Sequence, residues 1–121
     1  MNTKEILTAA VKALDEKKAM DIKVMEIGDL TIVAEDFVIA TGTSTTHVKA
    51  LADEVEYALS QKGIEPDHIE GKSTGWIVLD YETVVVHVFL GESREYYNLE
   101  RLWTDAKEID IKDLIGNGEN E

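Results

Sequence analysis

The sequence predicts an α/β fold, a mixed β-sheet with helices packed on it, built as a single domain. Segments with apolar residues at helical spacing alternate with short apolar runs of strand length, an order typical of a sheet covered by helices. The chain has 121 residues, of which 44% are hydrophobic and one is proline, and this suits one hydrophobic core. We expect the domain to span residues 1–115, followed by a flexible tail at residues 116–121.

The first three elements are predicted to be a helix and two strands. A helix over residues 2–18 places its apolar side chains on one face, and Asn2 and Glu5 have the spacing of a capping box. Residues 22–27 are predicted to form a strand that ends in a turn. Residues 36–41 form a short apolar run that ends at a glycine, which is typical of a strand buried on both faces.

A second helix and a hairpin follow. The helix begins within residues 43–46, carries an apolar face, and ends at Gly63, because glycine commonly follows the last turn of a helix. Residues 68–70 are predicted to form a brief edge strand. Residues 76–79 and 83–90 are predicted to pair as a hairpin, with the turn at residues 80–82 between them.

The last part of the chain is predicted to form one long helix and a final turn. Ser93 is placed to cap the helix, since its side chain can accept a hydrogen bond from a free backbone N–H. Ile109, Ile111 and Leu114 are expected to pack a final turn. The expected inner face of the long helix consists of Tyr96, Leu99, Leu102 and Trp103.

The charge of the chain points to a basic protein as its partner. Twelve Lys and Arg residues against 25 Asp and Glu give a formal net charge of −13. Binding to nucleic acids and to anionic membranes draws on positive charge, so we expect no direct DNA contact, little or no RNA contact and no membrane contact. An acidic surface attracts a basic protein and speeds their encounter. The alternative is that the acidity only aids solubility.

No residue pattern predicts a metal, a disulfide or a catalytic set. The chain has no cysteine, and its three histidines do not have the spacing of a zinc site on one element. No serine lies in a nucleophile elbow. No apolar run approaches the roughly 20 residues that span a bilayer, and the N-terminal residues do not resemble a secretory or transit peptide. We therefore expect a cytoplasmic protein without a cofactor.

The junction at residues 42–45 is the one candidate for a small-molecule site. A glycine that leaves a strand and hydroxyls that open a helix can hold a phosphate against backbone N–H groups. A nucleotidyltransferase would also need two carboxylates on a neighbouring strand, but Asp80 and Glu82 lie at the turn beyond it. Helix capping by Ser44 or Thr45 is the favoured interpretation, with a nucleotide-dependent transferase as the alternative.

Residues 75–103 contain more aromatic and charged side chains than the core of a sheet requires. Aromatic residues and arginine supply much of the binding energy at protein interfaces, so this stretch predicts a docking surface anchored by Trp76. The alternative is that Trp76 is a core residue. Exposed rings of this kind can also pair with a second copy, so a homodimer is a further expectation. The predicted partner-binding residues are Trp76, Asp80, Tyr81, Glu82, His87, Arg94 and Glu95.

Three motifs occur in order along the chain: GTSTTHVKALADEV at residues 42–55, Glu70-Gly71, and GWIVLDYETVVVHVFLGESREYYNLERLW at residues 75–103. Together they closely resemble the ribosomal silencing factor (RsfS, or Iojap-like) family. The resemblance implies a nucleotidyltransferase-like fold without enzymatic activity. It also implies a translational repressor that binds the large ribosomal subunit through its fourteenth protein. By occupying the face that meets the small subunit, such a protein blocks subunit joining, notably when nutrients are scarce.

The chain departs from the family pattern at two places. The family often has Gly-Asp where this chain has Glu82-Thr83, and often has arginine where this chain has Thr46. Two other functions remain as alternatives to an anti-association factor. One is the transferase at residues 42–45, which would bind a nucleotide with magnesium. The other is an acidic chaperone, which would bind a free basic ribosomal protein but not the assembled subunit.

Overall fold

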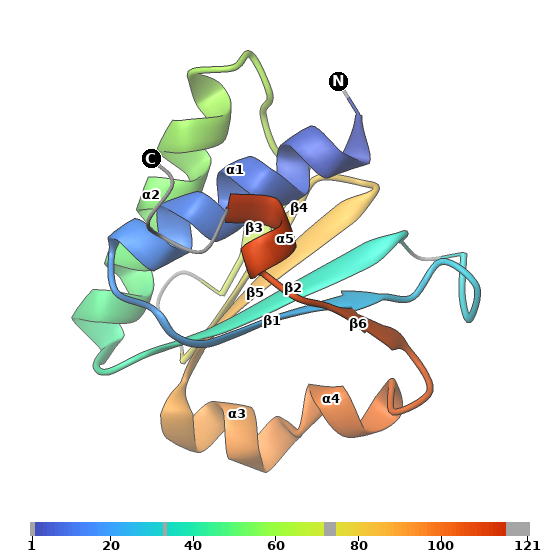
Figure 1. Ribbon diagram of the computed structural model, residues 1–121. Coiled ribbons are helices and arrows are strands. Elements are labelled where there is room, and N and C mark those ends of the chain that lie inside the picture. Colours follow the sequence, from blue (N-terminus) through green and yellow to red (C-terminus); the bar gives the residue numbers. More distant parts are fainter. Residues whose placement is uncertain (1, 33, 72–74, 116–121) are drawn as a thin grey trace.

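Six strands form one mixed sheet in the order β3-β4-β5-β2-β1-β6 (Figure 1). The computed structural model describes residues 2–32, 34–71 and 75–115. Strands β2 and β5 pair in parallel, and the other neighbours pair antiparallel. The predicted α/β fold with a mixed sheet is confirmed. The elements are α1 (Thr3–Glu16), β1 (Met20–Glu26), β2 (Asp36–Gly42), α2 (Thr45–Ser60), β3 (His68–Glu70), β4 (Trp76–Asp80), β5 (Val84–Leu90), α3 (Gly91–Tyr97), α4 (Leu99–Leu102), β6 (Lys107–Ile109) and α5 (Lys112–Ile115).

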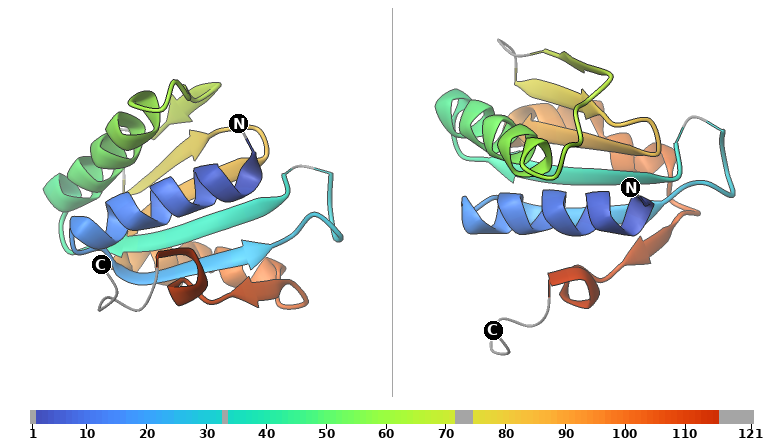
Figure 2. Two further views of the ribbon diagram at one scale, coloured as in Figure 1. Left: turned by 45° about the horizontal axis from the view of Figure 1, so that its top comes forward. Right: turned by 90° about the horizontal axis from the view of Figure 1, so that it is seen from above.

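Helices cover the two faces of the sheet unequally. The long helices α1 and α2 lie on one face together with α5, and the short helices α3 and α4 lie on the other (Figures 1 and 2). The parallel strands β2 and β5 lead into helices on opposite faces, since β2 is followed by α2 and β5 by α3. After the carboxyl ends of these two central strands, the chain therefore continues on opposite faces of the sheet.

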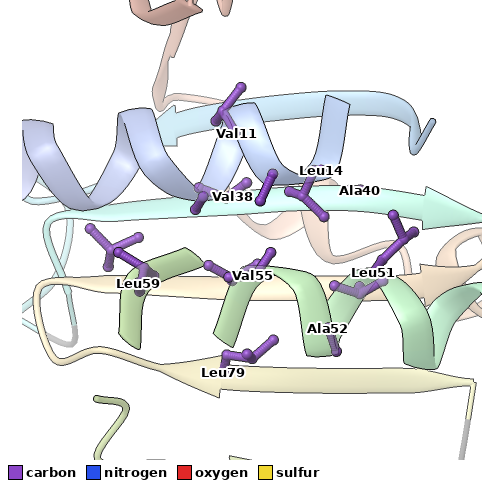
Figure 3. Packing of buried hydrophobic residues seen from close by; sticks show 14 of the residues in the cluster. Val11, Leu14, Val38, Ala40, Leu51, Ala52, Val55, Leu59 and Leu79 are labelled. Atoms are coloured by element: carbon purple, nitrogen blue, oxygen red, sulfur yellow. The ribbon is translucent and has the colours of Figure 1, made fainter. Parts of the chain in front are cut away.

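The main core lies between the sheet and helices α1 and α2 (Figure 3). Leu14 of α1 and Leu51 of α2 are fully buried and point toward β2, which contributes Val38 and Ala40 to the same layer (Figure 3). Strand β2 is buried along its whole length, which confirms the prediction of a strand covered on both faces. Burying one such side chain contributes about 1.5–3 kcal/mol, so this layer supplies most of the hydrophobic stabilisation.

Both long helices begin as the sequence predicts. The side chain of Asn2 accepts from the backbone N of Glu5 at 2.9 Å, and the Glu5 carboxylate accepts from the backbone N of Asn2 at 3.2 Å, so the capping box is present. Ser44 caps α2 by accepting from the backbone N of His47 at 3.1 Å. The predicted helix faces are buried: Ile6, Leu7, Ala10, Val11 and Leu14 in α1, and Val48, Leu51, Ala52, Val55 and Leu59 in α2.

The prediction of one long final helix is wrong. Helix α3 begins at Gly91, before Ser93, and Ser93 does not cap it. Asn98 then adopts a left-handed backbone (φ 45°), which ends α3 and redirects the chain into α4. Because of this break, Tyr96 and Leu102 are 82% and 72% exposed and do not face inward. Leu99 and Trp103 do pack on the second face of the sheet, as predicted.

The segment between α4 and α5 contains a strand that the sequence did not predict. Strand β6 pairs antiparallel with β1, Val24 lying opposite Ile109. Ile109, Ile111 and Leu114 pack against the main core, as the sequence predicts for this final segment. The predicted tail at residues 116–121 lies outside the described residues.

Candidate docking surface

The second face of the sheet is only partly covered by helices. Leu99, Trp103 and Ala106 pack against a smaller apolar cluster that includes Met25, Ile39 and Phe89. Helix α3 packs on β5 and β2. On the β3–β4 side of this face, side chains remain accessible: His68 is 54% exposed, Glu70 is 72% exposed and Asp80 is 29% exposed. We call this uncovered part the open face.

Trp76 lies between the open face and the core. Its ring stacks on Phe89, with ring centroids 4.9 Å apart, and contacts Tyr97 of α3 at 4.8 Å. Its indole Nε1–H donates to Nδ1 of His87 at 3.1 Å. Trp76 is half-buried. The ring is packed on one side while part of its surface stays accessible, so Trp76 is more than a core residue and its role as a docking anchor stays a prediction.

The buried side chain of His87 contacts Trp76 and holds its indole ring in place. It is 5% exposed, and burial lowers its pKa to about 4, although the charge of Asp80 acts in the opposite direction. Because Nδ1 accepts from Trp76, the proton of the neutral ring is on Nε2. The ring also contacts Phe37 edge-on, at 4.6 Å between centroids. His87 therefore positions the tryptophan and presents almost no surface of its own.

Acidic groups border the open face at β3, β4 and the hairpin turn. His68 lies between two carboxylates, with its Nε2 3.5 Å from Glu70 and 3.4 Å from Asp80. Asp80 also accepts from the backbone N of Glu82 at 2.8 Å. Glu82 is exposed and has φ 74°, the left-handed region that favours glycine. The turn thus holds the Glu82 carboxylate in solvent beside the strand end.

Tyr81 lies on the other side of the sheet from this surface. It is 5% exposed and belongs to the main core. Burial raises the pKa of its hydroxyl, and the charges of Glu56 and Glu65 raise it further. Successive residues of a strand point to opposite faces, so Tyr81 shares its side with Leu79 rather than with Trp76 or Asp80. The structure does not bring Tyr81 together with the other predicted residues.

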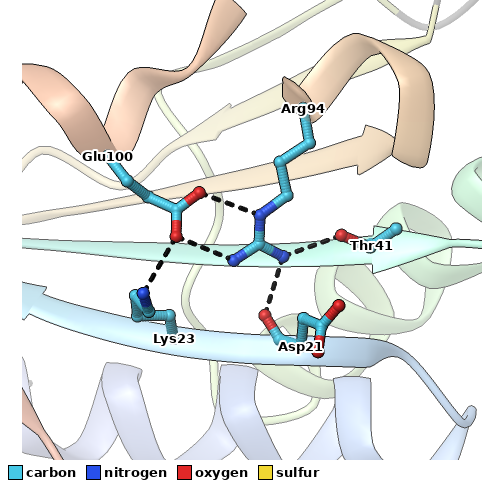
Figure 4. Close-up of polar contacts among 5 residues, drawn as sticks. All are labelled: Asp21, Lys23, Thr41, Arg94 and Glu100. Atoms are coloured by element: carbon cyan, nitrogen blue, oxygen red, sulfur yellow. Dashed lines mark hydrogen bonds and ion pairs between the residues drawn. The ribbon is translucent and has the colours of Figure 1, made fainter. Parts of the chain in front are cut away.

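Arg94 is the centre of an internal network between α3, α4 and the sheet (Figure 4). Its guanidinium donates to both oxygens of Glu100, at 3.0 and 3.2 Å, and to Oγ1 of Thr41 and the carbonyl of Asp21, both at 2.7 Å. Lys23 contacts Glu100 at 3.0 Å. The hydrogen bond from Arg94 lowers the pKa of Glu100 below its usual value. We call this network the Arg94 clasp.

The clasp explains where Arg94 and Glu95 lie. Only 12% of the Arg94 side chain is exposed, so its donors serve the fold rather than an open surface. Glu95 is exposed and lines, with Arg94, Asp21 and Asn98, a cavity of about 670 Å³ beside β1. Sequence reasoning missed Lys23, Thr41 and Glu100, since nothing in their local spacing signals a contact with α3. It also missed His68 and Glu70, although two residues at this spacing on the predicted edge strand are expected to lie on the same face of the sheet.

The junction at residues 42–45 uses its polar groups within the fold. The backbone N of Thr43 donates to Nδ1 of His47 at 2.9 Å, and Nε2 of His47 donates to the carbonyl of Lys17 at 2.9 Å. Ser44 is the cap of α2. A Cβ at Gly42 would lie 2.9 Å from Val48, so glycine is needed for close packing there. These observations favour the capping interpretation over a phosphate site.

Within residues 2–32, 34–71 and 75–115, no cluster of three or more His, Asp or Glu side chains has the arrangement of a metal site. In the same ranges, no helix combines the length and apolar character needed to cross a membrane.

A family model described as "Ribosomal silencing factor during starvation" matches residues 1–121. The chain belongs to the ribosomal silencing factor family. The RsfS protein of Bacillus subtilis is 40% identical over 112 residues, covering 92% of this chain and 95% of its own. A mouse protein named "Mitochondrial assembly of ribosomal large subunit protein 1" is 35% identical over 98 residues, which are 78% of this chain and 43% of that protein. The family resemblance drawn from the sequence is confirmed.

A solved structure agrees with this assignment. The crystal structure of a protein from Chromobacterium violaceum superimposes with a TM-score of 0.83 at 37% sequence identity, covering 86% of this chain and 88% of that one. Bacterial members of the RsfS family carry names that describe regulation of ribosomes rather than an enzymatic reaction.

Proposed function

We propose that this family member represses translation by binding the large ribosomal subunit through its fourteenth protein and blocking the approach of the small subunit. The observation that carries the proposal is the placement of Trp76, a half-buried ring at the start of β4, on the strand whose other end carries Asp80 on the open face. Such a ring can bury its remaining surface against a partner, while Asp80 and Glu82 pair with lysine or arginine side chains.

The charge of the chain supports a basic partner. The net charge is −13, and three of the carboxylates, Glu70, Asp80 and Glu82, lie at β3, at the end of β4 and at the hairpin turn that border the open face. Ribosomal proteins are suited to such a surface because they carry excess positive charge for RNA binding. The names of the relatives support the ribosome as the target, and the mouse relative's name refers to its large subunit.

Steric exclusion is a sufficient mechanism for this repression. A protein that occupies the face of the large subunit where the small subunit binds prevents joining without making or breaking a bond. No catalytic step is needed, and we infer that the protein is not an enzyme. The Thr43 N–H, which is bonded to His47, and the Ser44 hydroxyl, which caps α2, favour this over a nucleotide-dependent transferase.

Co-sedimentation with purified ribosomal subunits tests the proposal. We expect the protein to travel with large subunits and to bind the isolated fourteenth protein. Sedimentation with small subunits alone, or with neither, would contradict it. Glu82→Lys should mainly slow association and alter its salt dependence, since a rim charge steers the encounter. Glu16→Lys on α1 makes the same change in net charge on the other side of the sheet and should bind like the wild type.

A further inference from the structure

A series of ring contacts continues from Trp76 onto the outer surface of α3. Trp76 contacts Tyr97 at 4.8 Å between centroids, and Tyr97 contacts Tyr96 edge-on at 5.1 Å. Tyr97 is 52% exposed and Tyr96 is 82% exposed, and α3 has no buried residue. We call Tyr96 and Tyr97 the α3 ring pair. Its rings are exposed where the proposed docking surface ends, so they extend that surface from the sheet to a helix.

The Arg94 clasp fixes the position of the ring pair. Arg94 precedes the two tyrosines in α3, and its guanidinium binds Glu100 on the far side of the Asn98 break. The same guanidinium binds Thr41 and Asp21 of the sheet. Helix α3 is only seven residues long and would be marginal by itself. The clasp therefore holds two exposed rings at a set distance from Trp76, which lowers the entropy lost on binding.

The charges on α3 indicate what covers the rings. Glu92 and Glu95 are exposed on the same short helix, and neither takes part in an ion pair between described residues. A tyrosine face attracts a cation, and nearby carboxylates strengthen that attraction. A lysine or arginine side chain of a partner protein fits this combination of rings and acids, and an anionic partner does not.

We propose that the α3 ring pair is the second half of the docking surface and receives a lysine or arginine side chain of the basic protein that Trp76 contacts. The inference rests on the proposed function and adds a residue-level site to it. The partner then contacts two elements at once, strand β4 through Trp76 and helix α3 through Tyr96 and Tyr97. Correct binding depends on the angle between sheet and helix, which the Arg94 clasp sets.

Binding of Tyr96 variants to purified large subunits tests the inference most sharply, because Tyr96 is 82% exposed and its ring contact is with Tyr97. Tyr96→Ala should weaken binding about tenfold or more, as the loss of an interface ring does. Tyr96→Phe keeps the aromatic face and should bind like the wild type, whereas Tyr96→Leu should bind more weakly than Tyr96→Phe. Tyr57→Ala is the matched control, since Tyr57 is a 61% exposed tyrosine on α2.

The outcomes separate this inference from the proposed function. If the wild type binds large subunits and Trp76→Ala weakens binding, but Tyr96→Ala binds like the wild type, the ring-pair site is wrong and the proposed function stands. Equal binding of Tyr96→Leu and Tyr96→Phe overturns the cation contact. Failure of the wild type to bind overturns the proposed function itself. Melting temperatures near that of the wild type are expected for every Tyr96 variant, because this side chain is mostly in solvent.

Discussion

The indole N–H of Trp76 donates to Nδ1 of the buried His87 across two neighbouring strands, at 3.1 Å. This bond links a partly accessible ring to a residue that is 5% exposed. It also selects one tautomer of the neutral imidazole, with the proton on Nε2. The exposed part of Trp76 is thus oriented by the core beneath it. A docking anchor built in this way, as proposed for Trp76, needs little reorganisation when a partner arrives.

Replacing Trp76 tests this bond directly. Trp76→Phe keeps a ring on Phe89 but leaves Nδ1 of His87 without its donor, so we expect a loss of about 1–3 kcal/mol in the free energy of unfolding. Trp103→Phe is the control, because the buried Nε1 of Trp103 has no hydrogen-bond partner among the described residues. Denaturant unfolding measures both. An NMR tautomer assignment for His87 that is unchanged in Trp76→Phe, together with wild-type stability, would contradict the account.

Two buried groups, Asp36 and His87, should change the free energy of unfolding with pH in opposite directions. Burial, with the charges of Glu26 and Glu35, raises the pKa of Asp36 from 3.8 to about 6. The folded state then holds this proton more tightly, so the contribution of Asp36 to stability falls as pH rises from about 4 to about 6. For His87 the pKa is lowered from 6.5 to about 4, so its contribution falls as pH drops through that range.

Asp36→Asn should therefore steepen the rise of stability with pH. The variant removes the opposing slope of Asp36 and leaves that of His87. We expect its free energy of unfolding to increase more strongly than that of the wild type between about pH 4 and 6, and to exceed the wild-type value at pH 7.5. Urea unfolding at several pH values provides the measurement. Parallel curves for the two proteins would show that Asp36 is not a buried proton-binding group.

Loss of the Arg94 clasp should loosen α3 and α4 without unfolding the main core. Arg94→Lys keeps the positive charge but cannot make paired bonds to Glu100 while also reaching Thr41 and Asp21. We expect faster amide hydrogen exchange in residues 91–103 and a stability loss of about 1–2 kcal/mol. Arg101→Lys, an exposed residue of α4 outside the clasp, is the control and should exchange like the wild type. Unchanged exchange in Arg94→Lys would argue against the clasp.

Because of the backbone conformation of Glu82, glycine at this position should make the protein more stable than alanine does. Glu82 has φ 74°, which costs an ordinary residue about 1–2 kcal/mol relative to glycine. We expect Glu82→Gly to melt at a higher temperature than Glu82→Ala, which loses the same charge but keeps Cβ. The ordering of the two melting temperatures is the measurement, and the reverse order would place Glu82 in a right-handed conformation.

Local patterns predicted the parts of the fold that local interactions determine. The apolar run of β2 and the cap at Asn2 depend on residues close in sequence and were predicted correctly, and the cap of α2 is Ser44, one of the two residues predicted for it. The alternation of side chains along β4 also predicts the face of the sheet on which Tyr81 lies, because Tyr81 points to the same face as Leu79. The sequence interpretation grouped it with Trp76 because both are aromatic, and so overlooked the period of two.

Long-range contacts account for what the sequence did not reveal. Arg94 bonds to Asp21, 73 residues away, so its position on a helix surface gave no sign of its internal partners. The break at Asn98 comes from a left-handed backbone that asparagine tolerates but does not require. Strand β6 is three residues long and exists through its pairing with β1, which no local pattern of charged and apolar residues encodes.

Subunit joining measured after the protein is added first to purified large subunits tests the central claim most directly. The account predicts that the fraction of joined ribosomes falls as the protein approaches saturation of the large subunit. Trp76→Ala should require a much higher concentration for the same effect, provided that its melting temperature shows a folded domain. Wild-type protein that saturates large subunits and leaves the joined fraction unchanged would contradict the claim that this docking surface acts by steric exclusion.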